Sequence, residues 1–317
     1  MWYDKLGNYD VGIWNNSLKL VLAAAVFFAS YTDLAAGEEE KTVEIFSIDR
    51  KSTAKKREEG KMSHLSEAVL DMDFSASEIA IIMGEGAIPE LTALLGHEDA
   101  AVRMTAVIAI GALNLTEAHG LLFKALKDAD SNVSGTAMQK VEVQAPNIET
   151  ETLLGLLEKV KEPNALKRLL LLLGTRLELT QSAFIEPYCG RENDKVVMVA
   201  CAAALSKLGV TLRREQFAKY LTSISGPELN TAFDLVDYIN QPWLVYYLGT
   251  MLSNKEDIQS LGDTPPGFPN VLRVCDKAVP RIANITGNVF SFPTNLHANY
   301  DDRQLKEVED FAAQFKY

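Results

Sequence analysis

Cysteine is scarce in this sequence, and its scarcity excludes several kinds of site. Only Cys189, Cys201 and Cys275 occur among 317 residues, and no two of them form a Cys-x-x-Cys pair. So low and odd a count excludes a disulfide framework of the kind that holds small secreted domains together. Cys201 lies in the apolar run VVMVACAAAL, which is typical of a small buried side chain. A Cys189–Cys201 bridge remains the alternative interpretation.

Basic charge is also in short supply. Lysine and arginine number 31 against 43 aspartates and glutamates, so the formal net charge is −12. An acidic surface repels phosphate backbones, and we therefore expect no nucleic-acid partner. Because 47% of the residues are hydrophobic and 23% are charged, the composition is globular and the chain is long enough for a large core.

The familiar catalytic motifs are missing as well. No Gly-x-Ser-x-Gly elbow occurs, and GEGA at 84–87 lacks the Gly-Lys-Ser/Thr that completes a phosphate loop. The four histidines show neither His-x-His nor His-x-x-x-His spacing, and they are His64, His97, His119 and His297. We therefore expect no catalytic residue, no metal and no cofactor.

The N-terminal region is typical of a secretory signal. The ten residues 20–29 (LVLAAAVFFA) are apolar, Lys19 precedes them, and a small-residue stretch ending at Ala36 follows. Ten residues make a helix of about 15 Å, too short for a bilayer core of about 30 Å. We expect residues 1–36 to be a signal peptide or N-terminal anchor and the protein to be periplasmic or secreted. An uncleaved anchor over 18–36 and a buried cytosolic helix remain alternatives.

Paired helices are predicted for most of the remaining chain. Residues 37–63, dense in both charges, are expected to be a solvated linker. From 64 to 254, apolar residues recur at three- and four-residue spacing, which predicts helices that pair with a period of about 30 residues and no convincing strand. First helices are expected to begin near Ala87, Glu117, Glu149, Gln181, Leu212 and Gln241. Second helices are expected to begin near Asp99, Ser131, Asn164, Asp194 and Pro227, the first four as caps that accept hydrogen bonds from free amides.

One repeat shows the pattern most fully. It contains Ile88-Pro89-Glu90-Leu91, Leu94-Leu95, His97-Glu98-Asp99, Val102-Arg103, Ala106, Ala109-Ile110-Gly111 and Leu113. It resembles the HEAT-repeat family in its short bacterial form, recognisably over 75–209 and by period alone over 211–254. The resemblance implies an all-α, right-handed α-solenoid of about five to six helix pairs, with capping segments at both ends. Ser134 and Met198 stand where the family often has arginine, which argues against a continuous ladder of arginines.

The resemblance also implies where a partner would bind. Second helices usually line the concave side of such a solenoid. The candidate partner-binding residues on that side are Arg103, Gln139, Arg168 and Met198.

The C-terminal part is expected to close the solenoid. Residues 255–317 should hold a segment rich in proline and glycine and then capping helices, the last from Asp301 to Phe315. Pro280 is expected to interrupt or kink the helix before it. Aromatic side chains gather in this part, and they either seal the last repeat or line an exposed groove that grips a partner. Trp243 and Phe268 are the probes of the second interpretation.

Enzymes are known among HEAT-like proteins, and their site residues are not matched. The HEAT-fold deoxyhypusine hydroxylases bind two irons through several His-Glu pairs, whereas this chain has only His97-Glu98. Nothing singles out a tetrapyrrole pocket like that of HEAT-type bilin lyases, and the acidic balance opposes a HEAT-like DNA glycosylase. A metal site of His97, Glu98 and His119 is the alternative that remains.

We therefore expect a non-catalytic adaptor outside the cytoplasm that binds a protein or peptide partner through its concave face. The alternative is a metal-binding or lyase-like enzyme, or an enzyme accessory factor, on the same scaffold. A third interpretation is a membrane-tethered scaffold that keeps residues 18–36 as its anchor.

Overall fold

The structure is a computed structural model that describes residues 63–190, 194–262, 264 and 269–315. These residues belong to the unit Ser63–Tyr317. The expected signal or anchor at 1–36, nearly all of the linker at 37–63, and Phe268 lie outside the described residues. No helix in the described part of the chain is long and apolar enough to cross a lipid bilayer.

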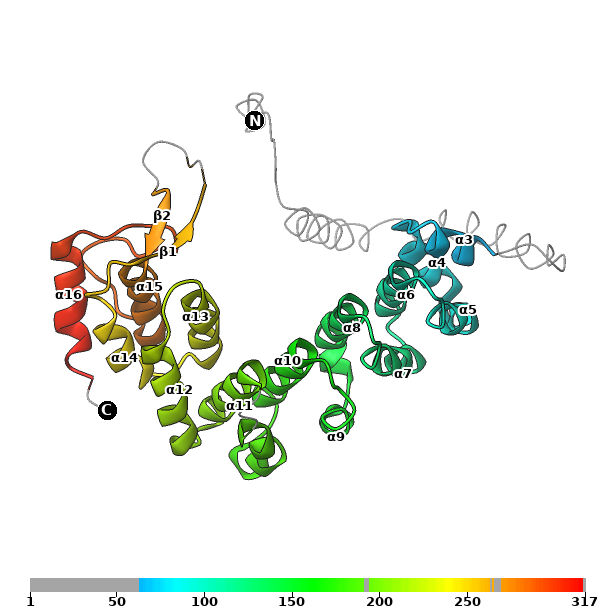
Figure 1. Cartoon of the computed structure of the whole chain (residues 1–317), viewed down its shortest axis with the longest axis horizontal. Helices are drawn as coiled ribbons and strands as arrows, with labels where there is room; N and C mark the ends of the chain where they lie inside the picture. The colour runs from blue at the N-terminus through cyan, green and yellow to red at the C-terminus, as the bar shows by residue number, and fades with distance from the viewer. Residues whose placement is uncertain (1–62, 191–193, 263, 265–268, 316–317) are drawn as a thin grey trace, which may run out of the picture. The chain divides into compact units, whose positions relative to one another are not determined.

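The helices of this unit form two rows, and the unit is an all-α solenoid (Figure 1). The first row contains α3 (His64–Leu70), α5 (Ile88–Leu94), α7 (Thr116–Ala125), α9 (Thr150–Leu154), α12 (Thr211–Ser223) and α14 (Leu244–Thr250). The second row contains α4 (Ser75–Met83), α6 (Ala100–Ala112), α8 (Ser131–Gln144), α10 (Pro163–Gly174), α11 (Lys195–Leu208), α13 (Glu228–Ile239) and α15 (Val274–Thr286). Each helix of the second row packs against the next, so the row is continuous from α4 to α15. The predicted stack of helix pairs with terminal caps is confirmed.

Polar side chains begin the second-row helices, although not always the expected ones. Asp99 accepts a hydrogen bond from the Ala101 amide at 2.8 Å, and Asp194 accepts one from the Val197 amide at 3.1 Å, as predicted. The caps of α8 and α10 are instead Asp130 and Glu162, which precede the expected Ser131 and Asn164. Pro163 explains the second case, because a proline at the first helical position leaves the preceding residue extended and free to cap. Helix α13 begins after Pro227, which is its N-cap and whose side chain forms no capping hydrogen bond.

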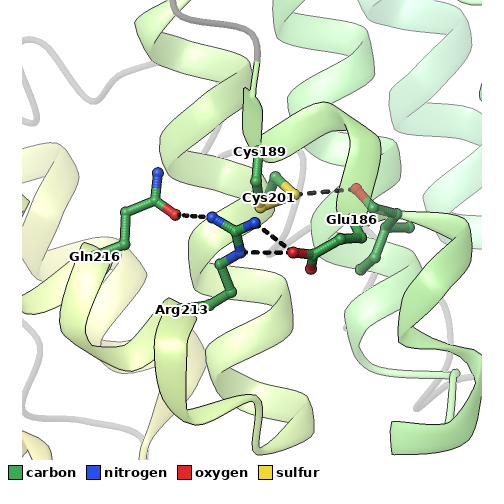
Figure 2. The surroundings of a disulfide bond; sticks show 6 residues. Glu186, Cys189, Cys201, Arg213 and Gln216 are labelled. Atoms are coloured by element: carbon green, nitrogen blue, oxygen red, sulfur yellow. Dashed lines mark hydrogen bonds and ion pairs between the residues drawn. A yellow bond between two sulfur atoms is a disulfide. The ribbon is translucent and has the colours of Figure 1, made fainter.

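Counted from the pair α3 and α4, the fifth repeat replaces its first α-helix with two short 3-10 helices, Leu179–Phe184 and Glu186–Gly190. Cys189, at the end of the second, forms a disulfide with Cys201 of α11, and their Cα atoms are 5.2 Å apart (Figure 2). Cys201 is buried, as expected, and the structure shows the alternative interpretation, a Cys189–Cys201 bridge. Arg213 of α12 donates hydrogen bonds to Glu186 and to Gln216, so α12 is tied to the same segment.

Helix α11 joins two apolar clusters. Ala200 and Cys201 belong to a cluster that extends back to Leu65, whereas Ala202 and Ala203 belong to one that extends forward to Ala312. A helix that is buried on both sides needs small side chains, which explains the run ACAAA from 200 to 204. The alanine-rich stretch is therefore the joint between the two halves of the core.

The junction of α10, α11 and α13 is packed so closely that only glycine fits at Gly174. A Cβ there would lie 2.8 Å from the Cβ of Ala204 and would also clash with the Tyr238 hydroxyl, which donates a hydrogen bond to the Leu171 carbonyl at 2.7 Å. We expect Gly174→Ala to lower the free energy of unfolding by about 1–3 kcal/mol, because overpacking strains the core. Urea unfolding measures the change. Gly120→Ala is the matched control, since a Cβ there meets open space; an equal effect in both variants would contradict the close packing.

The C-terminal part differs from the expectation in three details. A two-stranded antiparallel sheet, β1 (Asp257–Ser260) with β2 (Val271–Arg273), brackets the segment rich in proline and glycine. Helix α15 runs through Pro280, so of the two expected effects of this proline the interruption is wrong. The last helix, α16 (Asp302–Ala312), is shorter than predicted, although Asp301 caps it through the Gln304 amide at 2.8 Å.

The late aromatic residues are mostly packed together in this part. Phe290 stacks on Phe292 and meets Phe311 edge-on, with ring centroids 5.8 and 5.4 Å apart. Trp243 packs edge-on against Phe217 of α12. Both sets belong to the second apolar cluster, so in the described residues these rings seal the end of the solenoid.

Candidate functional site

A groove of about 520 Å³ lies between the first turns of α6 and α8, and we call it the α6–α8–α10 groove. Ala100, Ala101 and Met104 of α6 supply its apolar side. Helix α8 and its cap supply Asp130, Ser131, Asn132, Gly135, Thr136 and Gln139, and α10 supplies Arg168. A volume of this size is in the range of ligand-binding clefts.

Helical spacing explains why these side chains meet. Asn132, Thr136 and Gln139 are four and three residues apart, so they share one face of α8. Gly135 lies beside them and leaves open space, because a Cβ added to it would meet no atom within 4 Å. In the described part of the chain, the side chains of Asn132, Thr136 and Gln139 have no hydrogen-bond partner. They therefore offer uncharged donors and acceptors to a ligand.

The charged groups of the groove are already paired. Arg168 makes a two-pronged ion pair with Glu142 of α8, in which its Nε donates to Oε1 at 2.8 Å and its Nη2 donates to Oε2. Asp130 accepts hydrogen bonds from the Asn132 and Val133 amides at 2.8 and 3.2 Å, because it caps α8. The guanidinium keeps further N–H groups for a ligand, while Glu142 balances its charge and backbone amides occupy Asp130. The chemistry of the groove suits a neutral polar ligand such as a segment of peptide.

The structure brings two of the predicted partner-binding residues together and separates the others. Gln139 and Arg168 both line the groove. Met198 is half-buried and packs against the second apolar cluster. Trp243 is also half-buried, and its indole N–H donates to the Gln241 side chain at 3.1 Å. These two residues lie elsewhere in the core.

Arg103 has a structural role between repeats. Its Nε and Nη2 donate to Asp128 at 2.7 and 2.9 Å, and its Nη1 donates to the carbonyls of His97 and Glu98 at 2.9 Å each. This pairing raises the pKa of Arg103 and lowers the pKa of Asp128. Arg103 thus ties the turn before α6 to the turn before α8, and it does not line the α6–α8–α10 groove.

The histidines of the alternative metal site have other surroundings. His97 Nδ1 accepts a hydrogen bond from the Asp99 amide at 3.1 Å, which places it in the turn before α6. His119 lies in α7, is only 9% exposed, and has no partner at Nε2. Within the described residues, no three His, Cys, Asp or Glu side chains gather in a way that could hold a metal.

Burial of His119 predicts a pH dependence of stability. Desolvation lowers the pKa of His119 below the ordinary histidine value, because the surrounding apolar atoms disfavour the charged imidazolium. The unfolded chain therefore binds a proton that the folded chain resists, so stability is lost as the pH falls below about 6.5. We expect His119→Leu to reduce this loss in urea unfolding between neutral and acidic pH. The exposed His64→Leu is the control; if it flattened the profile equally, burial would not be the cause.

The sequence predicts only part of this groove. Asn132 and Thr136 were not singled out, although they precede Gln139 by seven and three residues on the same helix face. Extending the row backward from Gln139 at helical spacing would have found them. Asp130 does not stand out in the sequence, because the adjacent Ser131 is an equally good cap.

Comparisons with known proteins give one structural likeness. No family model and no curated protein matches the sequence. A solved structure, described as "The structure of the complex of CpcE and CpcF of phycocyanin lyase from Nostoc sp. PCC7120", contains a similar chain. The TM-score is 0.41 and the identity 16%, and the match covers 81% of this chain and 97% of that chain. The likeness concerns the fold alone. That structure is a complex of two protein subunits.

Two expectations from the sequence are corrected by this comparison. We expected a non-catalytic adaptor and no enzyme, whereas the similar structure belongs to a complex that is described as a lyase. The non-catalytic interpretation is therefore not retained. A lyase-like enzyme or enzyme accessory factor on a HEAT-like scaffold is therefore a proposal.

Proposed function

We propose that this chain is the substrate-holding or accessory subunit of a lyase-like enzyme and that it binds a segment of a protein partner in the α6–α8–α10 groove. The observation that carries the proposal is the groove itself. It combines a volume of about 520 Å³, an alanine-rich side, and three polar side chains that lack partners in the described part of the chain. A segment of peptide supplies both the N–H and C=O groups that such side chains bind.

The role of a subunit, rather than of a complete enzyme, is supported by what the groove offers chemically. Asp130 is occupied as a helix cap and Arg168 is paired with Glu142. In the part of the chain that is described, no histidine or cysteine lines the groove. General acid or base catalysis needs a group that can exchange a proton near neutral pH. That group would come from the partner or from another subunit.

Location outside the cytoplasm belongs to the same proposal. The apolar stretch 20–29 supports export, and the Cys189–Cys201 disulfide is the kind of bond that persists in oxidising compartments. The proposal also includes that the repeats of this chain are HEAT repeats of the short bacterial form. N-terminal sequencing of the purified protein separates a cleaved signal from an uncleaved anchor, since a chain that begins near Gly37 has lost residues 18–36.

Filling the groove tests the proposal. We expect Gly135→Leu to weaken partner binding by about tenfold or more, because the new side chain occupies the open space beside Thr136 and Gln139. Gly120→Leu is the matched control: Gly120 is also helical, a Cβ on it also meets open space, and it lies on α7 in the other row. Both substitutions replace a helical glycine, so both should raise the thermal midpoint slightly.

Partner binding is measured in the exporting host by placing a photo-crosslinking residue at position 139. The same residue at the exposed position Glu151 of α9 shows the level of non-specific cross-linking. The proposal predicts one cross-linked protein from position 139 that is lost in Gly135→Leu and kept in Gly120→Leu. Equal cross-linking in the two leucine variants would show that the groove is not the binding site.

A further inference from the structure

A second cavity, of about 600 Å³, lies near the C-terminal end of the solenoid, and we call it the α13–α15 pocket. It is formed by α13, α15 and the segment 287–296 that follows α15. It shares no lining residue with the α6–α8–α10 groove.

A buried arginine forms the fixed part of this pocket. Arg281 is 5% exposed, and its Nη2 donates a hydrogen bond to Asp237 at 2.6 Å. Its Nη1 donates to the Lys277 carbonyl at 2.9 Å, and its Nε donates to the Phe233 carbonyl at 3.4 Å. The guanidinium also lies over the Phe233 ring, 4.7 Å from the centroid. Four contacts hold its position, and three of its five N–H groups are occupied, so two remain for a ligand. Because Asp237 neutralises Arg281, the pair favours no net charge in that ligand.

Uncharged polar side chains surround this pair. Asn284 of α15, together with Asn288 and Thr294 of the following segment, has no side-chain hydrogen bond among the described residues. Asn295 accepts one from the His297 amide at 2.8 Å through Oδ1, which leaves its NH2 group available. The pocket therefore presents many donors and acceptors close together, fixed on a helix and on the segment packed beside it.

The mixture of groups indicates the kind of ligand. Each hydroxyl group of a sugar donates one hydrogen bond and can accept two, so a hydroxyl-rich molecule can satisfy carboxamides, a guanidinium and a carboxylate at the same time. A peptide would also bring side chains that need apolar pockets, and the apolar lining here is confined to small or single groups such as Pro280, Ala283 and Leu296. We propose that the α13–α15 pocket binds a neutral mono- or disaccharide.

The test uses the whole protein and ligand-observed saturation-transfer NMR, followed by titration. The probes are glucose, galactose, mannose, N-acetylglucosamine, maltose, sucrose and trehalose, with glucuronate as a charged counterpart and a capped Ala-Ser-Gly peptide as the competing class. We expect at least one neutral sugar to bind, and glucuronate to bind more weakly because the pocket has no unpaired cation for it.

Matched variants locate the binding. Asn284→Ala/Asn288→Ala removes two carboxamides that have no protein partner, so it should leave the fold intact and weaken sugar binding by about tenfold. Asn132→Ala removes a similarly unpartnered carboxamide from the α6–α8–α10 groove and should leave sugar binding unchanged. The proposal is overturned if no neutral sugar binds up to about 10 mM, if the double variant binds as well as the wild type, or if the peptide alone binds and depends on these asparagines. None of these outcomes bears on partner binding in the other groove.

Discussion

Replacing Cys189 and Cys201 together with serine is expected to lower the free energy of unfolding by about 2–4 kcal/mol. The bridge joins the 3-10 segment Glu186–Gly190 to α11 across a sequence separation of 12, and both cysteines are buried. Without it, the unfolded chain gains conformational freedom, and the fifth repeat has no first α-helix that could hold the segment in its place. The effect should be large because this segment covers the helix that joins the two apolar clusters.

Urea unfolding with and without a reductant measures this effect. Reductant should lower the unfolding midpoint of the wild type and leave that of the double-serine variant unchanged, because the variant has no bond to reduce. Cys275→Ala is the control: its thiol is free and buried in α15, so this variant should keep the sensitivity to reductant. If reductant had no effect on the wild type, the disulfide would not support the fifth repeat.

The second large effect is expected at Asp276, where Asp276→Ala should cost about 2–4 kcal/mol. The carboxylate is 1% exposed and accepts hydrogen bonds from the Arg273 amide at 3.0 Å, from Arg273 Nε and Nη2 at 2.7 Å each, and from the Tyr300 amide at 3.0 Å. It raises the pKa of Arg273, and Arg273 in turn donates to the Tyr300 carbonyl at 2.8 Å. Removing it leaves a partly buried guanidinium and a buried amide without their acceptor.

A comparison with an exposed aspartate isolates the effect of burial. Asp310 pairs with Lys306 at 2.9 Å on the surface of α16, and Asp310→Ala should change stability by less than about 1 kcal/mol. Both variants remove one carboxylate from the same C-terminal part, and chemical unfolding compares them directly. Similar losses would mean that the Asp276 network does not hold residues 295–301 against α15.

The periodic features of the fold could be predicted, because they depend on local chemistry. Asp99 and Asp194 cap helices where the pattern placed them, and the apolar stripes put the second-row helices in order. The small shifts at Asp130 and Glu162 show the limit of this reasoning, since several adjacent polar residues can serve as a cap. The strands β1 and β2 have only four and three residues, too few for an alternating pattern to be recognised.

Long-range pairings could not be predicted in the same way. Arg103 looked like a surface residue for a partner, but its ion pair joins it to Asp128, 25 positions later, through the shape of two turns. A disulfide forms only where the fold brings the Cα atoms of two cysteines close enough for their sulfur atoms to bond. A sequence separation of 12 does not say whether the fold does so. Gln139 and Arg168 were placed in one groove by helix stacking, whereas Met198 was drawn into the core by the second apolar cluster.

The most direct test of the proposed enzymatic role is the intact mass of the partner protein that cross-links at Gln139. It is measured after isolation from hosts that carry the wild-type chain, Gly135→Leu, Gly120→Leu or a deletion of the chain. A lyase-like role predicts a covalent difference in the partner between wild type and deletion, with Gly120→Leu like the wild type and Gly135→Leu like the deletion. If the partner's mass were the same in all four hosts, the chain would not take part in modifying the protein that it binds, and the account would be contradicted.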